Sequence, residues 1–323
     1  MSAVVDLVIP TVGRPSLGRL LAALGDEPER PELGRVVVVD DRPDGGEPLA
    51  PPLGPLAART VVACSHGRGP AAARNVGWRA CSAPWVAFLD DDVVPERGWL
   101  GALPDDLRSL PPDVAGSQGR IHVPLPPHRP PTDRERTVQG LETARWATAD
   151  MAYRRAVLER VGGFDERFPR AYREDADLGL RVVARGYAIV GGRRRVRHPV
   201  RPADPWVSVR LQAGNADDAL MRKLHGRGWR ARAGVPAGRR PRHLATAAAG
   251  MLGLAGVLLR RRPLAVAGLG GLVAGWAELA WARVAPGPRT PREVVTMLVT
   301  SAAIPFAASR HWLAGLRRAR RLA

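Results

Sequence analysis

Three adjacent carboxylates form the densest group of reactive side chains in the sequence. Asp90, Asp91 and Asp92 directly follow the apolar run Trp85–Leu89. Side chains this close repel one another unless a cation lies between them, and Mg²⁺ and Mn²⁺ prefer oxygen ligands. Alternate residues of an extended chain point the same way, so Asp90 and Asp92 can face one site while Asp91 points elsewhere. The triplet predicts a divalent-metal site that also holds a diphosphate, with a solvated acidic turn as the structural alternative.

A second acidic group lies at residues 174–177. Glu174, Asp177 and Arg181 have the spacing of one helix face, where Asp177 and Arg181 can pair. Asp175 falls at the start of the same helix and is expected to point elsewhere, toward a cleft. Acids at a helix start also suit the positive end of the helix dipole, so a purely structural role is the alternative.

Two further segments have the features of a phosphate or nucleotide site. Residues 67–77 begin as a glycine-rich loop and continue as a helix that carries Arg74 and Asn75 inward. Free backbone N–H groups at a helix start, together with a nearby guanidinium, favour a phosphate-bearing ligand. Asp40 and Asp41 end the apolar run that begins at residue 36, where a carboxylate can accept hydrogen bonds from a base or a ribose. A loop or helix cap is the structural alternative for this pair.

The segments that must position these side chains alternate in type along residues 4–100. Strands are expected at residues 4–9, 36–39, 61–63 and 85–89, and helices at residues 17–24 and 71–80. Apart from Asp6, the strand segments are almost wholly apolar, which indicates a parallel sheet covered on both faces in an α/β fold. Ligand sites in such sheets gather at the carboxyl ends of the strands, where the acidic groups fall.

The composition limits the classes of protein to which this sequence can belong. Of its 323 residues, 45% are hydrophobic, which allows a sizeable core and excludes a wholly disordered chain. Lys and Arg number 49 against 31 Asp and Glu, a net charge of +18, and Lys223 is the single lysine. This balance suits nucleic acid, acidic lipid or phosphorylated substrates. Cys64 and Cys81 are too few for a disulfide scaffold or a cysteine-based zinc site.

Taken in chain order, the motifs resemble those of the family 2 glycosyltransferases of the GT-A fold. The resemblance covers residues 4–200 and implies a Rossmann-like nucleotide-diphospho-sugar transferase domain. The motifs that carry it are Ile9-Pro10-Thr11 with Arg14-Pro15, Val39-Asp40-Asp41, Ala73-Arg74-Asn75-Val76-Gly77, Phe88-Leu89-Asp90-Asp91-Asp92, Gly162-Gly163-Phe164-Asp165-Glu166, and Glu174-Asp175-Ala176-Asp177-Leu178 with Arg181.

The resemblance implies an inverting, hexosyl-type glycosyltransferase. Such an enzyme moves a sugar from a nucleotide-sugar donor to a hydroxyl acceptor, free or lipid-linked, in a cell-envelope glycan, a glycolipid or a secondary metabolite. By the same resemblance, Asp175 is the general base that removes the acceptor proton, and Glu174 orients Asp175 or contacts the acceptor. Mg²⁺ or Mn²⁺ is the expected cofactor, because a cation stabilises the departing nucleoside diphosphate.

The resemblance also implies which residues bind metal and donor. Asp90 and Asp92 would form the metal-binding D-x-D pair, with Asp92 the direct ligand. His198 would add a metal or diphosphate contact, with a structural role as its alternative. The residues expected to bind the nucleotide-sugar are Pro10, Thr11 and Asp40 in the nucleobase and ribose pocket, with Arg14, Arg74, Asn75, Asp90 and Asp91.

The composition changes near Arg242, after which three apolar runs follow. Residues 244–259 and 294–309 carry no charge, residues 264–282 carry only Glu278, and arginines bracket the runs. We expect a catalytic domain at residues 1–205, a basic helical linker at 206–242, and a hydrophobic, mostly helical region at 243–323 that associates with a membrane or crosses it as a transmembrane helix. A soluble helical hairpin is the alternative. With no secretory signal at the start, the expected location is the cytoplasmic face of the cell membrane.

Two other functions compete with this interpretation. A sugar-phosphate nucleotidyltransferase would share the sheet and the acidic metal site, but the loop after the first strand has a single glycine and no lysine. A non-enzymatic binder of nucleic acid or anionic surfaces would suit the net charge. The arginines gather instead around the C-terminal apolar runs, without interleaved aromatic residues, so no nucleic-acid partner is expected.

Overall fold

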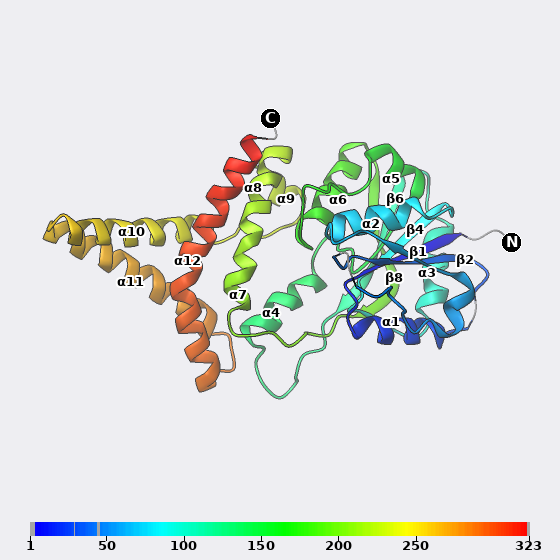
Figure 1. Cartoon of the computed structure of the whole chain (residues 1–323), viewed down its shortest axis with the longest axis horizontal. Coiled ribbons are helices and arrows are strands. Elements are labelled where there is room, and N and C mark those ends of the chain that lie inside the picture. Colours follow the sequence, from blue (N-terminus) through cyan, green and yellow to red (C-terminus); the bar gives the residue numbers. More distant parts are fainter. Residues whose placement is uncertain (1–3, 29, 44–45, 322–323) are drawn as a thin grey trace. The chain divides into compact units, whose positions relative to one another are not determined.

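The computed structural model describes residues 4–28, 30–43 and 46–321 (Figure 1). The chain forms two compact units. The first comprises residues 1–124, 139–199 and 232–234, and the second comprises residues 125–138, 200–231 and 235–323. The chain therefore passes from one unit to the other and back before either is complete.

The first unit is built on one mixed sheet. Within the described residues its eight strands lie in the order β3-β2-β1-β4-β7-β6-β8-β5. Strands β3, β2, β1 and β4 are parallel neighbours, as the sequence predicts, and β6 is parallel to β8. Strand β7 runs antiparallel to both β4 and β6, so the sheet is mixed rather than parallel throughout. The strands are β1 (Val5–Thr11), β2 (Leu33–Asp40), β3 (Thr60–Cys64), β4 (Trp85–Leu89), β5 (Val94–Pro95), β6 (Val114–His122), β7 (Asp150–Arg154) and β8 (Ala188–Arg197).

Helices cover both faces of this sheet. On one face, α1 (Ser16–Gly25) and α3 (Trp99–Arg108) pack their leucines with Leu7 and Ile9 of β1 in one apolar core. On the other face lies α2 (Pro70–Arg79), which approaches β1 so closely that a Cβ on Gly77 would sit 2.2 Å from Cγ1 of Val8. Two more helices, α5 (Arg155–Val161) and α6 (Glu174–Ala184), complete the unit.

The layout brings the acidic motifs to one edge of the sheet. The parallel strands β1, β2 and β4 end at Thr11, Asp40 and Leu89, and Asp90–92 follow the last of these. Because parallel strands point their carboxyl ends the same way, these residues share the edge where open α/β sheets bind ligands.

The second unit is helical, as the sequence predicts for the C-terminal region. A buried arginine, Arg283 of α11, connects four of its segments. The guanidinium donates to Oδ2 of Asp133 at 2.8 Å, Oγ of Ser208 at 2.9 Å, Oγ1 of Thr300 at 2.8 Å and Oγ of Ser301 at 3.0 Å. The helices are α4 (Asp133–Gln139, whose last residue lies in the first unit), α7 (Val207–Arg210), α8 (Gly214–His225), α9 (Trp229–Arg232, likewise), α10 (Arg240–Leu258), α11 (Arg262–Val284) and α12 (Pro291–Arg320).

Candidate active site

A buried arginine joins the two acidic motifs. Arg74 of α2 is 2% exposed, and its guanidinium donates to Oδ1 of Asp90 and to Oε1 of Glu174, both at 2.8 Å. It also lies over the ring of Phe164, 5.6 Å from the centroid. The inward orientation expected from the sequence is therefore confirmed. Residues about 100 positions apart in the chain meet around one cation, so Arg74 fixes Asp90 and Glu174 relative to each other.

Asp175 is the half-buried acid beside this buried cluster. It follows Glu174 in the first turn of α6, and its Oδ1 accepts a hydrogen bond of 2.6 Å from the backbone N–H of Ala176. Burial raises the pKa of Asp175 above its ordinary value, while that N–H and the Arg74 and Arg173 guanidinium groups act in the opposite direction. A carboxylate with a raised pKa is a stronger proton acceptor.

Glu174 is the buried neighbour of Asp175. Its side chain is almost fully enclosed, and Oε2 has no hydrogen-bond partner among the described residues. Burial and the adjacent Asp175 carboxylate raise the pKa of Glu174, and Arg74 opposes that rise. Of the two roles suggested by the family resemblance, orientation of Asp175 fits this enclosure, whereas contact with an acceptor does not.

The start of α6 has unusual backbone geometry. Arg173, the residue before the helix, has a positive φ of 79°, a conformation that non-glycine residues seldom adopt. Asp177 and Arg181 form the i, i+4 ion pair that the sequence predicts, at 2.7 Å. Arg181 also donates to the carbonyl oxygen of Gly163 at 2.7 Å, which ties the helix to the Gly-Gly turn. These contacts hold the helix start, and with it Asp175, in one position.

The three predicted metal ligands are not assembled as a set. Among the described residues, no group of three or more His, Cys, Asp and Glu side chains could hold a metal ion. Asp90 is committed to Arg74, as described above. Asp92 and His198 do meet, with Oδ1 of Asp92 3.5 Å from Nε2 of His198, and both side chains are buried.

The Asp92–His198 pair fits a cation that takes most of its ligands from substrate. Mg²⁺ in nucleotide sites is commonly held by one or two protein side chains, with phosphate oxygens and water completing the shell. His198 Nδ1 is buried and has no hydrogen-bond partner among the described residues, so the ring is not fixed by a second protein contact. The chain thus supplies two donors at this position.

Asp91 is bonded to two residues at and near the end of β1. Its Oδ2 accepts a hydrogen bond of 2.6 Å from the Thr11 hydroxyl, and its Oδ1 pairs with Arg14 at 2.7 Å. Asp91 is 2% exposed. The three residues were each predicted to bind the nucleotide-sugar; the structure joins them to one another, linking the end of β1 to the end of β4. Pro10, also predicted to line the nucleobase pocket, is half-buried within β1 beside them.

Asp40 has an arginine partner of its own. The Arg42 guanidinium donates to both of its carboxylate oxygens at 2.8–3.1 Å, and the resulting hydrogen bonds hold the pKa of Asp40 below its ordinary value. A ribose or base that donates a hydrogen bond to Asp40 would therefore compete with the Arg42 guanidinium for its carboxylate oxygens. The neighbouring Asp41 accepts from the Ser65 hydroxyl at 2.7 Å and from the Gly69 N–H at 3.1 Å, so it fixes the glycine-rich loop.

Asn75 holds the Gly-Gly-Phe segment. Its side-chain amide donates to the carbonyl oxygen of Phe164, and its Oδ1 accepts from the Phe164 N–H and from Nε1 of Trp78, at 2.8–2.9 Å. The residue is 1% exposed. Predicted to contact the nucleotide-sugar, Asn75 in this structure has its polar atoms occupied within the protein.

Sequence reasoning missed Tyr153 and Arg42. The Tyr153 hydroxyl on β7 is buried without a hydrogen-bond partner among the described residues, and its pKa is raised by burial and by the Asp175 carboxylate. No local pattern marks this tyrosine, because its interaction with Asp175 depends on how β7 and α6 pack in the fold. Arg42 had a signal, since it stands two residues after Asp40, where a side chain can turn back onto the carboxylate.

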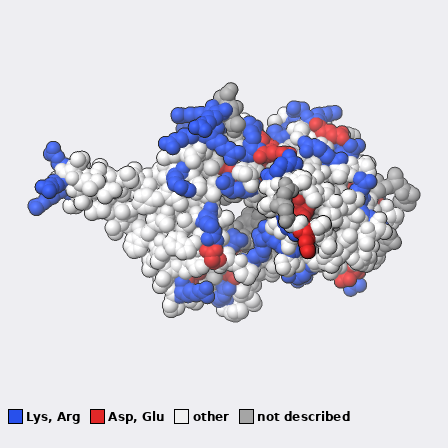
Figure 2. All heavy atoms as spheres, in the orientation of Figure 1, with Lys and Arg blue, Asp and Glu red and all other residues white. Residues whose placement is uncertain are grey.

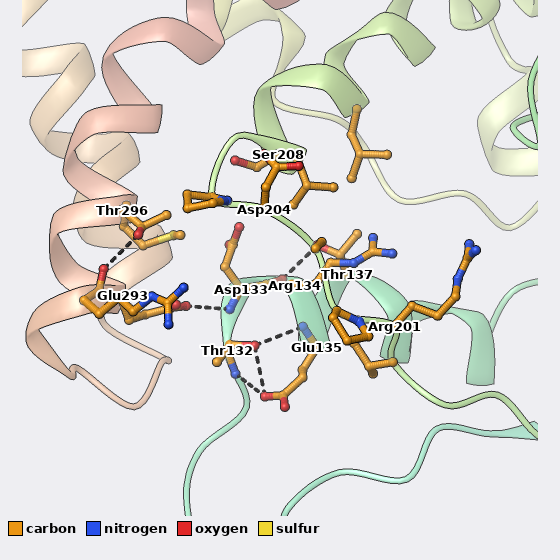
Figure 3. A pocket seen from close by; sticks show the side chains of 18 of the residues that line it. Thr132, Asp133, Arg134, Glu135, Thr137, Arg201, Asp204, Ser208, Glu293 and Thr296 are labelled. Carbon is orange, nitrogen blue, oxygen red and sulfur yellow. Dashed lines mark hydrogen bonds between the residues drawn. The ribbon is translucent and has the colours of Figure 1, made fainter. Parts of the chain in front are cut away.

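A separate cavity of about 420 Å³ lies in the second unit (Figure 3). Residues from α4, α12 and the segment 200–211 line it. Glu293 accepts a hydrogen bond of 2.9 Å from the Asp133 N–H, and Glu135 accepts bonds from the Thr132 N–H and hydroxyl. The acids at its wall are thus bound to neighbouring residues, and none of them belongs to the acidic motifs of the first unit.

The family of the chain follows from comparison with known sequences. The family model described as glycosyl transferase family 2 matches residues 6–177, more than half of the 323 residues. The chain therefore belongs to glycosyl transferase family 2. The matched range includes every acidic motif described above and ends at Asp177 of α6.

Two curated relatives and one solved structure are similar to parts or all of the chain. The pre-mycofactocin glycosyltransferases of Mycobacterium tuberculosis strains CDC 1551 / Oshkosh and H37Rv are each 34% identical over 165 residues, covering 47% of this chain and 34% of theirs. The chain thus matches about a third of those relatives' length. The mannosyltransferase PcManGT from Pyrobaculum calidifontis, solved with GDP-Man and Mn²⁺, is 18% identical with a TM-score of 0.50, covering 99% of this chain and 87% of that one. The likeness shows that the first unit has the GT-A fold.

Proposed function

We propose that the chain transfers a sugar from a nucleotide-sugar to a hydroxyl acceptor, with inversion at the anomeric carbon and with a divalent cation. The observation that carries the proposal is Asp175: a half-buried carboxylate with a raised pKa, held at the start of α6 beside the cluster that Arg74 forms with Asp90 and Glu174. Family membership supplies the reaction class. The GDP-Man and Mn²⁺ bound by the PcManGT structure support a nucleoside-diphosphate donor and a metal.

In the proposed reaction, Asp175 accepts the proton of the acceptor hydroxyl as that oxygen attacks the anomeric carbon. A single displacement by one oxygen inverts the configuration. Glu174, held by Arg74, keeps Asp175 in place. Burial first, and then the nearby Asp90 carboxylate, raise the pKa of Asp175. Asp92 and His198 would hold Mg²⁺ or Mn²⁺, which when bound neutralises charge on the departing nucleoside diphosphate.

For the acceptor, we propose a hydroxyl of a cell-envelope glycan, a glycolipid or a secondary metabolite, reached at the cytoplasmic face of the cell membrane. The relatives named pre-mycofactocin glycosyltransferase support glycosyl transfer, the activity that their name states. Support for the membrane comes from the second unit, where α11 is, by length and composition, the one described helix apolar enough to cross a bilayer.

The proposal is tested with a panel of nucleotide-sugars and Mn²⁺. We expect one donor class to raise the melting temperature and to release nucleoside diphosphate when acceptors are added, with both effects lost in chelator. Asp92→Asn should weaken metal-dependent binding of the nucleoside diphosphate, whereas Asp105→Asn, an exposed aspartate of α3, should leave it unchanged. Proton NMR of the product reports inversion or retention. Release of pyrophosphate would instead identify a nucleotidyltransferase, and salt-dependent nucleic-acid binding without turnover would identify a binder.

A further inference from the structure

Helices α10 and α11 form a hairpin with its large apolar side chains on the outside. The two helices lie side by side and are joined by residues 259–261 (Figure 1). Leu258 and Val266 are each 73% exposed and Leu259 is 67% exposed. Exposure is not confined to one face: Leu252, Leu254 and Val257 are all exposed and, at 100° per residue, point in different directions around α10.

Glycine residues lie where α10 and α11 contact each other. A Cβ on Gly268 of α11 would lie 2.1 Å from the backbone nitrogen of Gly253 in α10, and a Cβ on Gly256 would lie 2.3 Å from the nitrogen of Ala265. The two backbones are therefore nearly in contact. Any larger residue at these positions would force the helices apart.

This arrangement is the reverse of a water-soluble helix pair. In water, large apolar side chains are placed between helices and polar ones outside, because burial of apolar surface stabilises the fold. In lipid, apolar side chains gain nothing by turning inward, and helices associate through small residues that let their backbones approach. The hairpin follows the second pattern.

Charges lie only at the two ends of the hairpin. Arg260, Arg261 and Arg262 form the tip, and the salt bridges of Glu278 with Arg239 and Arg242 mark the base. Figure 2 shows the blue tip separated from the rest of the positive charge by a white stretch. From residue 243 to 259 the chain carries no Asp, Glu, Lys or Arg, which at 1.5 Å per residue is about 26 Å of helix.

We propose that the α10–α11 hairpin crosses a lipid bilayer, with its arginine tip in the headgroup layer opposite to its base. This inference rests on the proposed location at a membrane. By length and composition α11 is the one described helix apolar enough to cross a bilayer, and α10, uncharged over residues 243–259, would cross beside it because the two backbones are nearly in contact. The apolar length of α10 is close to the ~30 Å hydrocarbon core, and arginine side chains extend along apolar surface to reach polar headgroups. Three adjacent arginines at the bilayer centre would be strongly unfavourable, which argues against insertion to half depth.

The orientation follows from the charge distribution. Six arginines between residues 239 and 292 flank the base, against three at the tip, and positive residues are retained on the cytoplasmic side. Two crossings return the chain to the side it left, so the first unit and α12 would share the cytoplasmic side. A second copy of this chain would cover one face of the hairpin, whereas exposure on all faces fits lipid.

Fractionation of cells that express the full chain tests the insertion. We expect the protein to stay in the membrane pellet after washes with high salt and with alkaline carbonate. The double variant Leu258→Glu and Val266→Glu should raise the soluble fraction at least tenfold, whereas Val61→Glu, at an exposed apolar position of β3, should not. Full release of the unaltered protein by salt or carbonate would overturn the proposal. So would a soluble dimer that the double variant dissociates.

Cysteine labelling tests the crossing. In a Cys64→Ser background, which leaves the buried Cys81, Arg261→Cys at the tip is compared with the exposed Ala237→Cys before α10. A membrane-impermeant maleimide should label the tip in intact spheroplasts and Ala237→Cys only after permeabilisation. Labelling of both only after permeabilisation would overturn the crossing. Donor turnover is assayed in detergent on the same proteins, so a failed insertion is distinguished from a failed assignment of activity.

Discussion

At the scale of single residues, the site depends on how Arg74 compensates two acids. The guanidinium is removed from water, and its ion pairs with the partly exposed Asp90 and the buried Glu174 offset the cost of burying it. Asp175 lies just outside this cluster, where solvent and substrate can reach it. In the proposed reaction, the enclosed Glu174 positions its neighbour and the accessible Asp175 takes the proton.

Asp175→Asn should lower kcat by about 10²–10⁴-fold, because the amide cannot accept the acceptor proton while its shape is nearly the same. Binding of nucleoside diphosphate with Mn²⁺, measured by calorimetry, should change little. Asp113→Asn, at an exposed position of the same unit, is the matched control. Near-normal turnover by Asp175→Asn would remove this residue as the base.

The pH dependence should reflect the raised pKa of Asp175. A base acts only when ionised, so kcat/KM should fall as pH drops through that pKa, which lies above the ordinary aspartate value. Arg74 lowers the pKa of Asp175, so Arg74→Gln should move this acidic limb to higher pH. A pH–rate profile of both proteins measures this shift. An acidic limb at the same or a lower pH in the variant would contradict the prediction.

Arg74→Gln should also lower the free energy of unfolding by about 3–5 kcal/mol, since it leaves the Glu174 and Asp90 carboxylates without their cation. Denaturation in urea at neutral pH measures this loss. Arg74 lowers the pKa of the buried Glu174, so without it that carboxyl favours protonation more strongly, and part of the stability should return at acidic pH. A loss that is the same at every pH would mean that the ion pairs contribute little.

At the scale of elements, the Gly-Gly turn before Phe164 is held by α2. Gly163 has a positive φ of 70°, and a Cβ there would lie 2.5 Å from Oδ1 of Asn75 and 2.7 Å from Nε1 of Trp78. Gly162 has a similar φ of 81° with no atom within 4 Å of such a Cβ. Both glycines have a positive φ, but only Gly163 has close neighbours. Substitutions at the two positions therefore distinguish backbone strain from steric conflict.

Gly162→Ala should lower the free energy of unfolding by about 1–2 kcal/mol, the cost of a left-handed conformation for an L-residue. Gly163→Ala carries the same strain and should lose a further 1–3 kcal/mol or so from overpacking. It should also reduce kcat, since the turn is tied to α6 through Arg181. Equal decreases in the free energy of unfolding of the two variants would show that Asn75 and Trp78 move away from the added methyl group at no cost.

The sequence predicted elements well and partners poorly. Continuous apolar runs locate β1, β2 and β4 because fully buried strands must be apolar on both faces. The reversed direction of β7 leaves no such trace, since an apolar pattern reads the same either way. Burial of Arg74 was likewise predictable from the helix periodicity, but its contact with Glu174 depends on how two distant helices meet. The hydrogen bond between Thr11 and Asp91 could not be predicted either, because it depends on β1 and β4 lying side by side in the sheet.

At the scale of the whole molecule, the segment 125–138 belongs to the second unit, although it lies within the stretch expected as the catalytic domain. Its Asp133 is bonded to Arg283 and, through its N–H, to Glu293. The boundary predicted at residue 205 stays a prediction, but a fragment cut there would lose both partners of this segment.

Trypsin should therefore cleave after Arg134 and Arg136 about tenfold faster in a fragment of residues 1–205 than in the full chain, because cleavage follows local opening. Mass spectrometry of timed digests locates the cuts. Cleavage after Arg97, an exposed residue of the first unit, should proceed at similar rates in both proteins. Equal protection at Arg134 in the fragment would show that the segment folds without α11 and α12.

The interleaving of the two units restricts how this protein can be recombined. Junctions at 124/125, 138/139, 199/200, 231/232 and 234/235 each divide one unit from the other, so no single crossover exchanges either unit intact. Consider a chimera that keeps the first unit of this chain and takes the second unit of another enzyme. It must take two separate stretches from that enzyme, those that correspond to residues 125–138 and to the helices after residue 199. Gene fusions that exchange only the tail would pair an α4 from one parent with an α11 from the other.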